Sequence, residues 1–129
     1  MTKSMKKLWR RLILDAEDIG LPISDVDLCM RPYSKCYYGN YFPRQEGSKR
    51  RPRVYVYPYR DRNGCMYSYD LIMDTLIHEM VHHVQYTSPD FVRLKGVMHN
   101  PEFWEIYNRY LFKAKLLGVI SDEYKSEAA

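Results

Sequence analysis

The segment SYDLIMDTLIHEMVHHVQYTSPD, residues 68–90, has the pattern of one long helix. Ser68 or Asp70 can cap its N-terminus, and the Thr-Ser-Pro run at residues 87–89 can end it. Apolar residues recur between these limits at helical spacing: Leu71, Ile72, Leu76, Met80 and Val84. We therefore predict a buried helix here.

This predicted helix contains the motif His-Glu-x-x-His at His78, Glu79 and His82. Residues four apart share a helix face, so both imidazoles can reach one ion. Glu79 lies about 100° round the helix, where its carboxylate can reach a water on that ion without becoming a ligand. The motif predicts a catalytic zinc site with Glu79 as general base.

A third ligand is predicted at His99, directly before a second helix. Asn100 is a strong N-cap, Pro101 fits the first helical position, and the helix is expected to continue to Leu117, before Gly118. Its apolar stripe is expected to pack on the motif helix and bring His99 over the pair: Phe103, Tyr107, Tyr110, Leu111, Ala114 and Leu117. Three imidazoles leave the fourth zinc position for water, an arrangement that predicts peptide hydrolysis.

Two polar neighbours on the motif helix are expected outside the ligand set. His83 faces away from the pair and is predicted to be structural or to support a ligand. Asp74, one turn before His78, could orient an imidazole, but a solvated helix face is the favoured interpretation.

The strings DTLIHEMVHHVQY and GVMHNPEFW resemble the SprT-like zincin domain, the metallopeptidase domain also found in Spartan proteases. In that family His-Gly-Pro-x-Phe follows HExxH, and here Asn100 replaces the glycine. The resemblance covers residues 68–117 and implies a zinc metalloendopeptidase with a zincin-like fold. Family members often carry a zinc ribbon of paired Cys-x-x-Cys motifs, which the three cysteines of this chain do not form.

Upstream of the motif, the pattern predicts one helix and three strands. Apolar residues form a stripe through the basic N-terminal segment up to Gly20: Met5, Leu8, Trp9, Leu12, Ile13, Ala16 and Ile19. Alternation at residues 26–30, 37–41 and 53–57 predicts strands. The fold class is therefore α+β, with a small, mostly antiparallel sheet. Residues 53–57, before Pro58, are our candidate for an edge strand that binds an extended peptide substrate.

A chain of 129 residues predicts a single domain over residues 1–129, with 121–129 as a short tail. Three cysteines without framework spacing and no secretory signal predict a cytoplasmic protein, and no stretch is long enough to span a membrane.

The formal net charge is +4, and basic residues gather in two stretches. These are Lys3, Lys6, Lys7, Arg10 and Arg11, and then Arg44, Lys49, Arg50, Arg51, Arg53, Arg60 and Arg62. Such patches can neutralise phosphates. The resemblance to Spartan-type enzymes, which act on protein bound to DNA, implies a substrate associated with DNA; a solvated basic surface is the other expectation.

Two alternative functions remain open from the sequence. One is a basic nucleic-acid-binding protein in which HExxH is inert. The other is a zinc hydrolase of the peptide deformylase type, in which Cys36 would replace His99 as ligand; the flanks YSKCYYG do not resemble the deformylase cysteine motif.

Overall fold

The computed structural model describes residues 2–89 and 99–126. Its elements follow the chain in this order: α1 (Lys3–Ile19), a short 3-10 helix η1 (Ile23–Asp25), β1 (Asp27–Met30), β2 (Gly39–Phe42), β3 (Arg53–Val56), α2 (Tyr69–Thr87) and α3 (Pro101–Leu116). The predicted α+β class is confirmed. Within the described residues no helix is long and apolar enough to cross a membrane. Most of the connection expected between the second and third α-helices lies outside these residues.

The sheet is mixed, with strand order β1-β3-β2. β1 runs parallel to β3, and β2 runs antiparallel to it. The prediction of a mostly antiparallel sheet was therefore wrong, because alternation reveals a strand but not its direction. The edge-strand prediction for residues 53–57 was also wrong: β3 is central. Pro58 lies beyond the last residue of β3, where it removes no ladder hydrogen bond.

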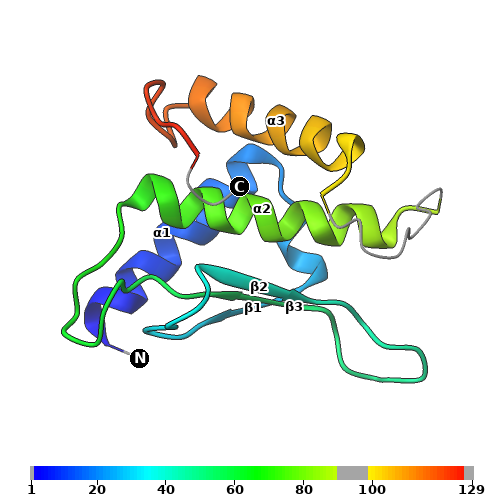
Figure 1. Ribbon diagram of the computed structural model, residues 1–129, viewed down its shortest axis with the longest axis horizontal. Helices are drawn as coiled ribbons and strands as arrows, with labels where there is room; N and C mark the ends of the chain where they lie inside the picture. Colours follow the sequence, from blue (N-terminus) through cyan, green and yellow to red (C-terminus); the bar gives the residue numbers. More distant parts are fainter. Residues whose placement is uncertain (1, 90–98, 127–129) are drawn as a thin grey trace.

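One face of the sheet is covered by helices. Val54 and Val56 of β3 point into the core, and Figure 1 shows α2 lying along this side of the sheet, with α3 on the far side of α2. Arg53 and Tyr55 alternate with the valines and so belong to the opposite face. The core is formed mainly by the inner sheet face, α1 and α2.

Each of the three α-helices begins after a side-chain N-cap, and α1 ends at the glycine that the sequence predicts. Thr2 caps α1, and Gly20 ends it with φ of 89°, a conformation that glycine adopts without strain. Ser68 Oγ accepts a hydrogen bond from Leu71 N at 3.3 Å at the start of α2. Asn100 Oδ1 accepts one from Phe103 N at 2.8 Å at the start of α3.

The packing of α3 onto α2 is confirmed for part of the predicted stripe. Phe103, Tyr107 and Ala114 are buried. Leu117 is 50% exposed, so its predicted contact was wrong. The helix ends one residue earlier than expected, and Leu117 is its C-cap.

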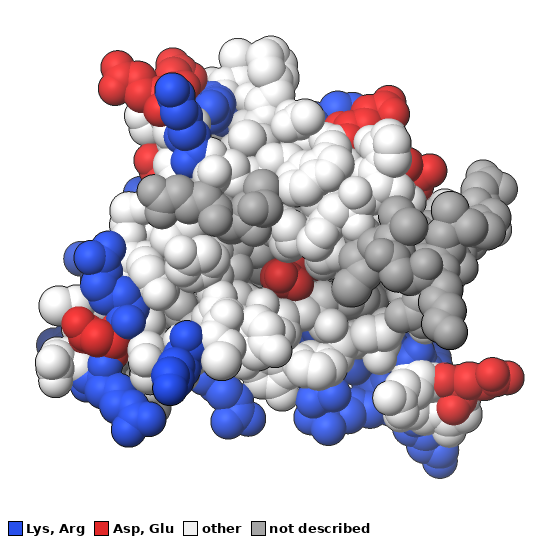
Figure 2. All heavy atoms as spheres, viewed as in Figure 1, with Lys and Arg blue, Asp and Glu red and all other residues white. Residues whose placement is uncertain are grey.

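Basic side chains concentrate on the sheet side of the molecule. Figure 2 shows Lys and Arg along its lower edge, where Figure 1 shows the sheet and the connection from β2 to β3. That connection, residues 43–52, carries Arg44, Lys49, Arg50 and Arg51.

Candidate metal centre

Three histidines bring one ring nitrogen each to a common point. His99 Nε2 lies 3.1 Å from His78 Nε2 and 3.2 Å from His82 Nε2. Within the described residues they form a group close enough to bind a metal ion. A tetrahedral ion with bonds of 2.0–2.1 Å separates two ligand nitrogens by about 3.3 Å. The spacing of the three imidazoles therefore fits such an ion.

The entrance of α3 is tied to α2, and this places His99. Gln85 is buried on α2, and its side-chain amide donates to Asn100 Oδ1 at 2.9 Å and to Glu102 Oε1 at 3.3 Å. Asn100 Oδ1 also caps the helix through Phe103 N. One oxygen thus joins the two helices directly beside His99. Sequence patterns gave no reason to single out Gln85, because its partners lie 15 and 17 residues away.

Aromatic rings form an apolar wall around the imidazoles. The Phe103 ring centroid lies 5.0 Å from that of His78 and 4.7 Å from that of His82, and Trp104 lies 5.6 Å from His99. Burial, the largest cause, lowers the pKa of His78 to about 4 and of His82 to about 3, and it also lowers the pKa of His99. All three are therefore neutral at pH 7, as ligation requires.

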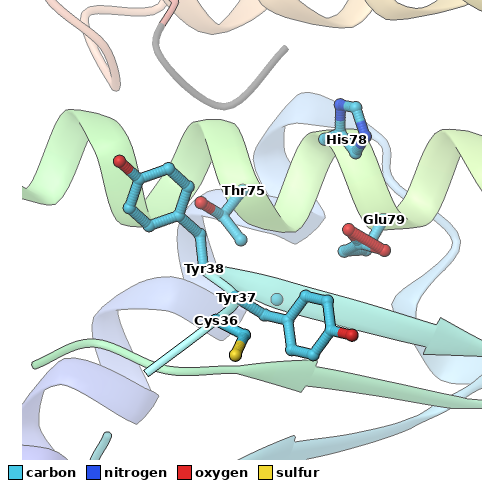
Figure 3. Close-up of a pocket in the computed structure, with 7 residues that line it drawn as sticks. Cys36, Tyr37, Tyr38, Thr75, His78 and Glu79 are labelled. Carbon is cyan, nitrogen blue, oxygen red and sulfur yellow. The ribbon is translucent and has the colours of Figure 1, made fainter. Parts of the chain in front are cut away.

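A cleft opens beside the histidines, between α2 and the chain leading into β2. It is lined by Cys36, Tyr37, Tyr38, Gly39, Thr75, His78 and Glu79. Figure 3 shows Glu79 pointing from α2 toward β2, whereas His78, which also lines the cleft, points away from β2. Glu79 is only 8% exposed, and this burial raises its pKa to about 7. A carboxyl group with that pKa can both accept and return a proton near neutral pH.

Gly39 allows β2 to approach α2 closely at the cleft. A Cβ atom at this position would lie 2.7 Å from Thr75 Cγ2, 2.7 Å from the Tyr55 carbonyl oxygen and 3.3 Å from Glu79 Cγ. No side chain fits there without displacing the backbone or α2. Nothing in the sequence pattern singles out Gly39, since its neighbours come from two other elements, α2 and β3.

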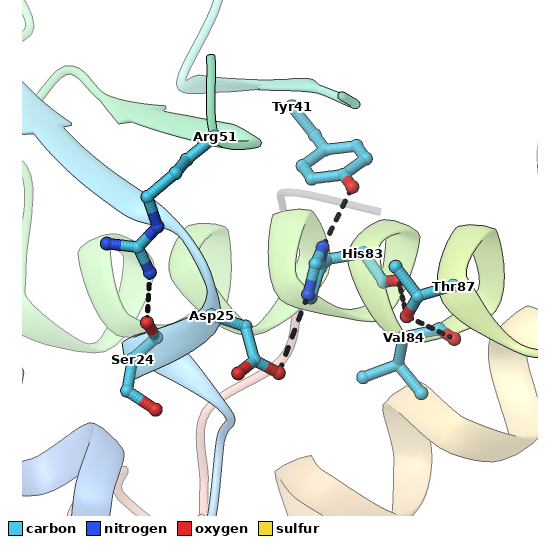
Figure 4. Close-up of polar contacts among 7 residues, drawn as sticks. All are labelled: Ser24, Asp25, Tyr41, Arg51, His83, Val84 and Thr87. Carbon is cyan, nitrogen blue, oxygen red and sulfur yellow. Dashed lines mark hydrogen bonds and ion pairs between the residues drawn. The ribbon is translucent and has the colours of Figure 1, made fainter. Parts of the chain in front are cut away.

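His83 lies apart from the ligand group, as predicted. It is buried, its Nδ1 atom lies 2.8 Å from Tyr41 Oη, and its Nε2 atom lies 3.8 Å from Asp25. Figure 4 shows His83 between these two residues, which come from β2 and η1. His83 therefore links β2 and η1 to the helix that carries His78 and His82.

Two other expectations concern Asp74 and Cys36. Asp74 is fully buried, so the expectation of a solvated helix face was wrong; hydroxyl groups from distant parts of the chain surround its carboxylate. Cys36 lines the cleft but does not belong to the three-histidine group.

Comparisons with protein families, with characterised proteins and with solved structures find no match to this chain.

Proposed function

We propose that the protein is a zinc-dependent metalloendopeptidase of the SprT-like zincin type. The observation that carries the proposal is the convergence of three Nε2 atoms next to a cleft lined by Glu79. Neutral imidazole ligands suit Zn²⁺, and three protein ligands are the number found in catalytic zinc sites.

In this proposal the three histidines bind the metal ion and Glu79 transfers the proton. His78, His82 and His99 would hold the ion, which when bound acidifies a water molecule and polarises a substrate carbonyl. Glu79 accepts the proton of the attacking water and returns it to the leaving amine. Its buried position keeps the carboxyl group away from bulk water.

The cleft suits an extended peptide substrate. β2 is an edge strand, because its only partner among the described strands is β3. A peptide could add to this edge through backbone hydrogen bonds and so lie across the cleft wall that contains Glu79. The substrate-binding strand of this proposal is therefore β2, in place of residues 53–57.

Hydrolysis of an unstructured protein such as casein by the zinc-loaded chain tests the proposal. We expect Glu79→Gln to retain one equivalent of zinc and to lose at least 100-fold in rate, since general-base catalysis contributes about 10²–10⁴-fold. Equal rates in the two proteins would reject the proposed peptidase function. Failure of the wild-type protein to bind zinc would reject it as well.

A second candidate function, nucleic-acid binding, is favoured by the outward face of the sheet. The Arg53 guanidinium lies 4.9 Å from the Phe42 ring centroid and that of Arg31 lies 5.3 Å from the Tyr55 ring centroid, while Tyr55 and Tyr57 stack. Arginines interleaved with aromatic rings suit phosphates and unpaired bases. Fluorescence anisotropy with a labelled single-stranded oligonucleotide tests this function: binding at low salt that weakens in Arg53→Ala supports it, and no binding at low salt removes it.

The two functions are compatible. If both hold, the substrate would be a protein associated with DNA, held near the cleft by the basic face. Cleavage of a basic DNA-bound protein with and without DNA would separate this substrate class from unassociated proteins.

A further inference from the structure

Asp74 is a buried carboxylate one helical turn before the ligand His78. It is 0% exposed, and a buried charge is stable only when it is paired or well hydrogen-bonded. Three hydroxyl groups provide those hydrogen bonds. Tyr107 Oη donates to Asp74 Oδ1, and Tyr124 Oη and Ser126 Oγ each donate to Oδ2 at 2.7 Å. No cation pairs with Asp74 among the described contacts.

The hydroxyl groups come from two separate parts of the chain. Tyr107 belongs to α3, whereas Tyr124 and Ser126 belong to the segment after it. That segment is itself anchored, because Lys115 Nζ donates to the Tyr124 carbonyl at 2.8 Å and the buried Ile120 joins the core. Residues 120–126, here called the C-terminal segment, therefore lie against α2 at Asp74.

The carboxylate is coupled to the metal centre in two ways. The Tyr107 ring, whose hydroxyl binds Asp74, also contacts the His78 ring at 6.3 Å between centroids. The negative charge of Asp74 acts directly on the His78 imidazole, where it favours positive charge. A divalent cation at His78 would be stabilised by the same field, since a buried anion interacts strongly with nearby charge.

His78 depends on this support more than a typical zinc ligand would. A histidine that binds a metal through one ring nitrogen usually donates a hydrogen bond from its other ring nitrogen to a carboxylate or carbonyl group. His78 Nδ1 is buried and has no hydrogen-bond partner within the described residues. Within the described residues, ring packing and the charge of Asp74 are what can orient this imidazole and raise its affinity for a cation.

We propose that Asp74 is a positioning residue of the metal centre and that the C-terminal segment sets metal affinity by holding its carboxylate. The proposal rests on metal binding by the three histidines, as in the proposed function, but not on peptide hydrolysis. Removing a hydroxyl group of the C-terminal segment should then weaken metal binding by the three histidines, none of which belongs to the segment.

The chain offers a matched control. Tyr69 Oη donates to Asp15 at 2.5 Å, which is a second tyrosine–aspartate hydrogen bond between helices. Tyr69 lies nine residues before His78 on α2, roughly 13 Å along the helix axis. Changes to this pair should alter stability without altering the metal centre.

The experiment is a Zn²⁺ titration against a competing chelator, with the thermal midpoint of each metal-free protein measured in parallel. We expect Asp74→Asn to weaken Zn²⁺ binding about 10- to 100-fold, the usual effect of losing support behind a ligand. The milder Tyr124→Phe should weaken it several-fold. Asp15→Asn and Tyr69→Phe should leave the affinity unchanged even where they lower the midpoint. Absorption of the Co²⁺-loaded proteins should shift in Asp74→Asn alone.

The outcomes separate this inference from the proposed function. Wild-type affinity in both Asp74→Asn and Tyr124→Phe would overturn the inference and leave the metal centre in place. Equal loss of affinity in the Asp15 and Tyr69 controls would also overturn it, because the effect would then follow stability alone. Wild-type protein that binds no Zn²⁺ would overturn both proposals.

Discussion

The buried side chain of Gln85 donates a 2.9 Å hydrogen bond to Asn100 Oδ1, the atom that also caps α3. This contact joins the last turns of the helix that carries His78 and His82 to the residue that follows His99. The position of the third imidazole over the pair therefore depends on a hydrogen bond that involves none of the three.

Replacing Gln85 should consequently weaken metal binding. We expect Gln85→Ala to lower the free energy of unfolding by about 1–3 kcal/mol, because the hydrogen bonds of a buried side-chain amide are lost. It should also weaken Zn²⁺ binding about 10-fold or more. Thr87→Ala is the control: Thr87 Oγ1 donates to the His83 carbonyl at 2.8 Å within α2, so this hydrogen bond does not join the two helices. Chelator competition measures the affinity, and equal effects of the two substitutions would contradict the role of Gln85.

The choice of His99 over Cys36 as the third ligand gives a second prediction. His99→Ala should reduce bound zinc to well below one equivalent, because two imidazoles rarely retain zinc against a chelator. Cys36→Ser should leave the zinc content unchanged, since Cys36 lines the cleft outside the ligand group. Metal analysis of the two purified variants checks this, and the reverse result would favour a deformylase-like site.

Gly39 provides a third prediction. Gly39→Ala should destabilise the protein by about 1–3 kcal/mol, the usual cost of inserting a methyl group where there is no space. It should also slow peptide hydrolysis, because the new atom would press on Glu79. Adding Thr75→Ser removes one of the two 2.7 Å contacts and should restore part of the stability. Denaturant unfolding of the single and double variants measures this, and a fully stable Gly39→Ala would show that β2 can move away.

The features that could be predicted from the sequence depend on residues close together in the chain. Helix caps at Ser68 and Asn100 involve partners three residues away, and the His78–His82 pair needs only helical spacing. The place of His99 at the start of a helix could be predicted because Asn100 and Pro101, which mark that start, directly follow it. The mixed sheet, in contrast, depends on which strand lies between the other two, and alternation carries no such information.

The burial of Asp74 likewise depends on residues that are distant in the sequence. Its hydroxyl partners lie 33, 50 and 52 residues further along the chain. An aspartate on an otherwise apolar helix is usually solvated, and nothing near it in the sequence indicates three donors. The burial of Asp74 therefore could not be predicted from the motif or from the residues next to it.

The raised pKa of Glu79 gives the last prediction, for the metal-free protein. An unfolded glutamate ionises near pH 4.5, whereas burial raises the pKa of Glu79 in the folded protein to about 7. Between these values the folded state retains a proton that the unfolded state has lost. Glu79 therefore contributes stability that is fully present below pH 4.5 and is lost as the pH rises through 7.

The histidines act in the opposite direction, because pKa values of about 4 for His78 and 3 for His82 lie below the unfolded value of 6.5. Their contribution is present above pH 6.5 and is lost as the pH falls toward these values. Glu79→Gln removes the glutamate contribution alone. In urea unfolding with EDTA, the stability of this variant relative to wild type should rise from pH 4.5 to 7 by up to about 1.4 kcal/mol per pH unit. A difference that does not change with pH would mean that Glu79 is ionised in the folded protein throughout this range.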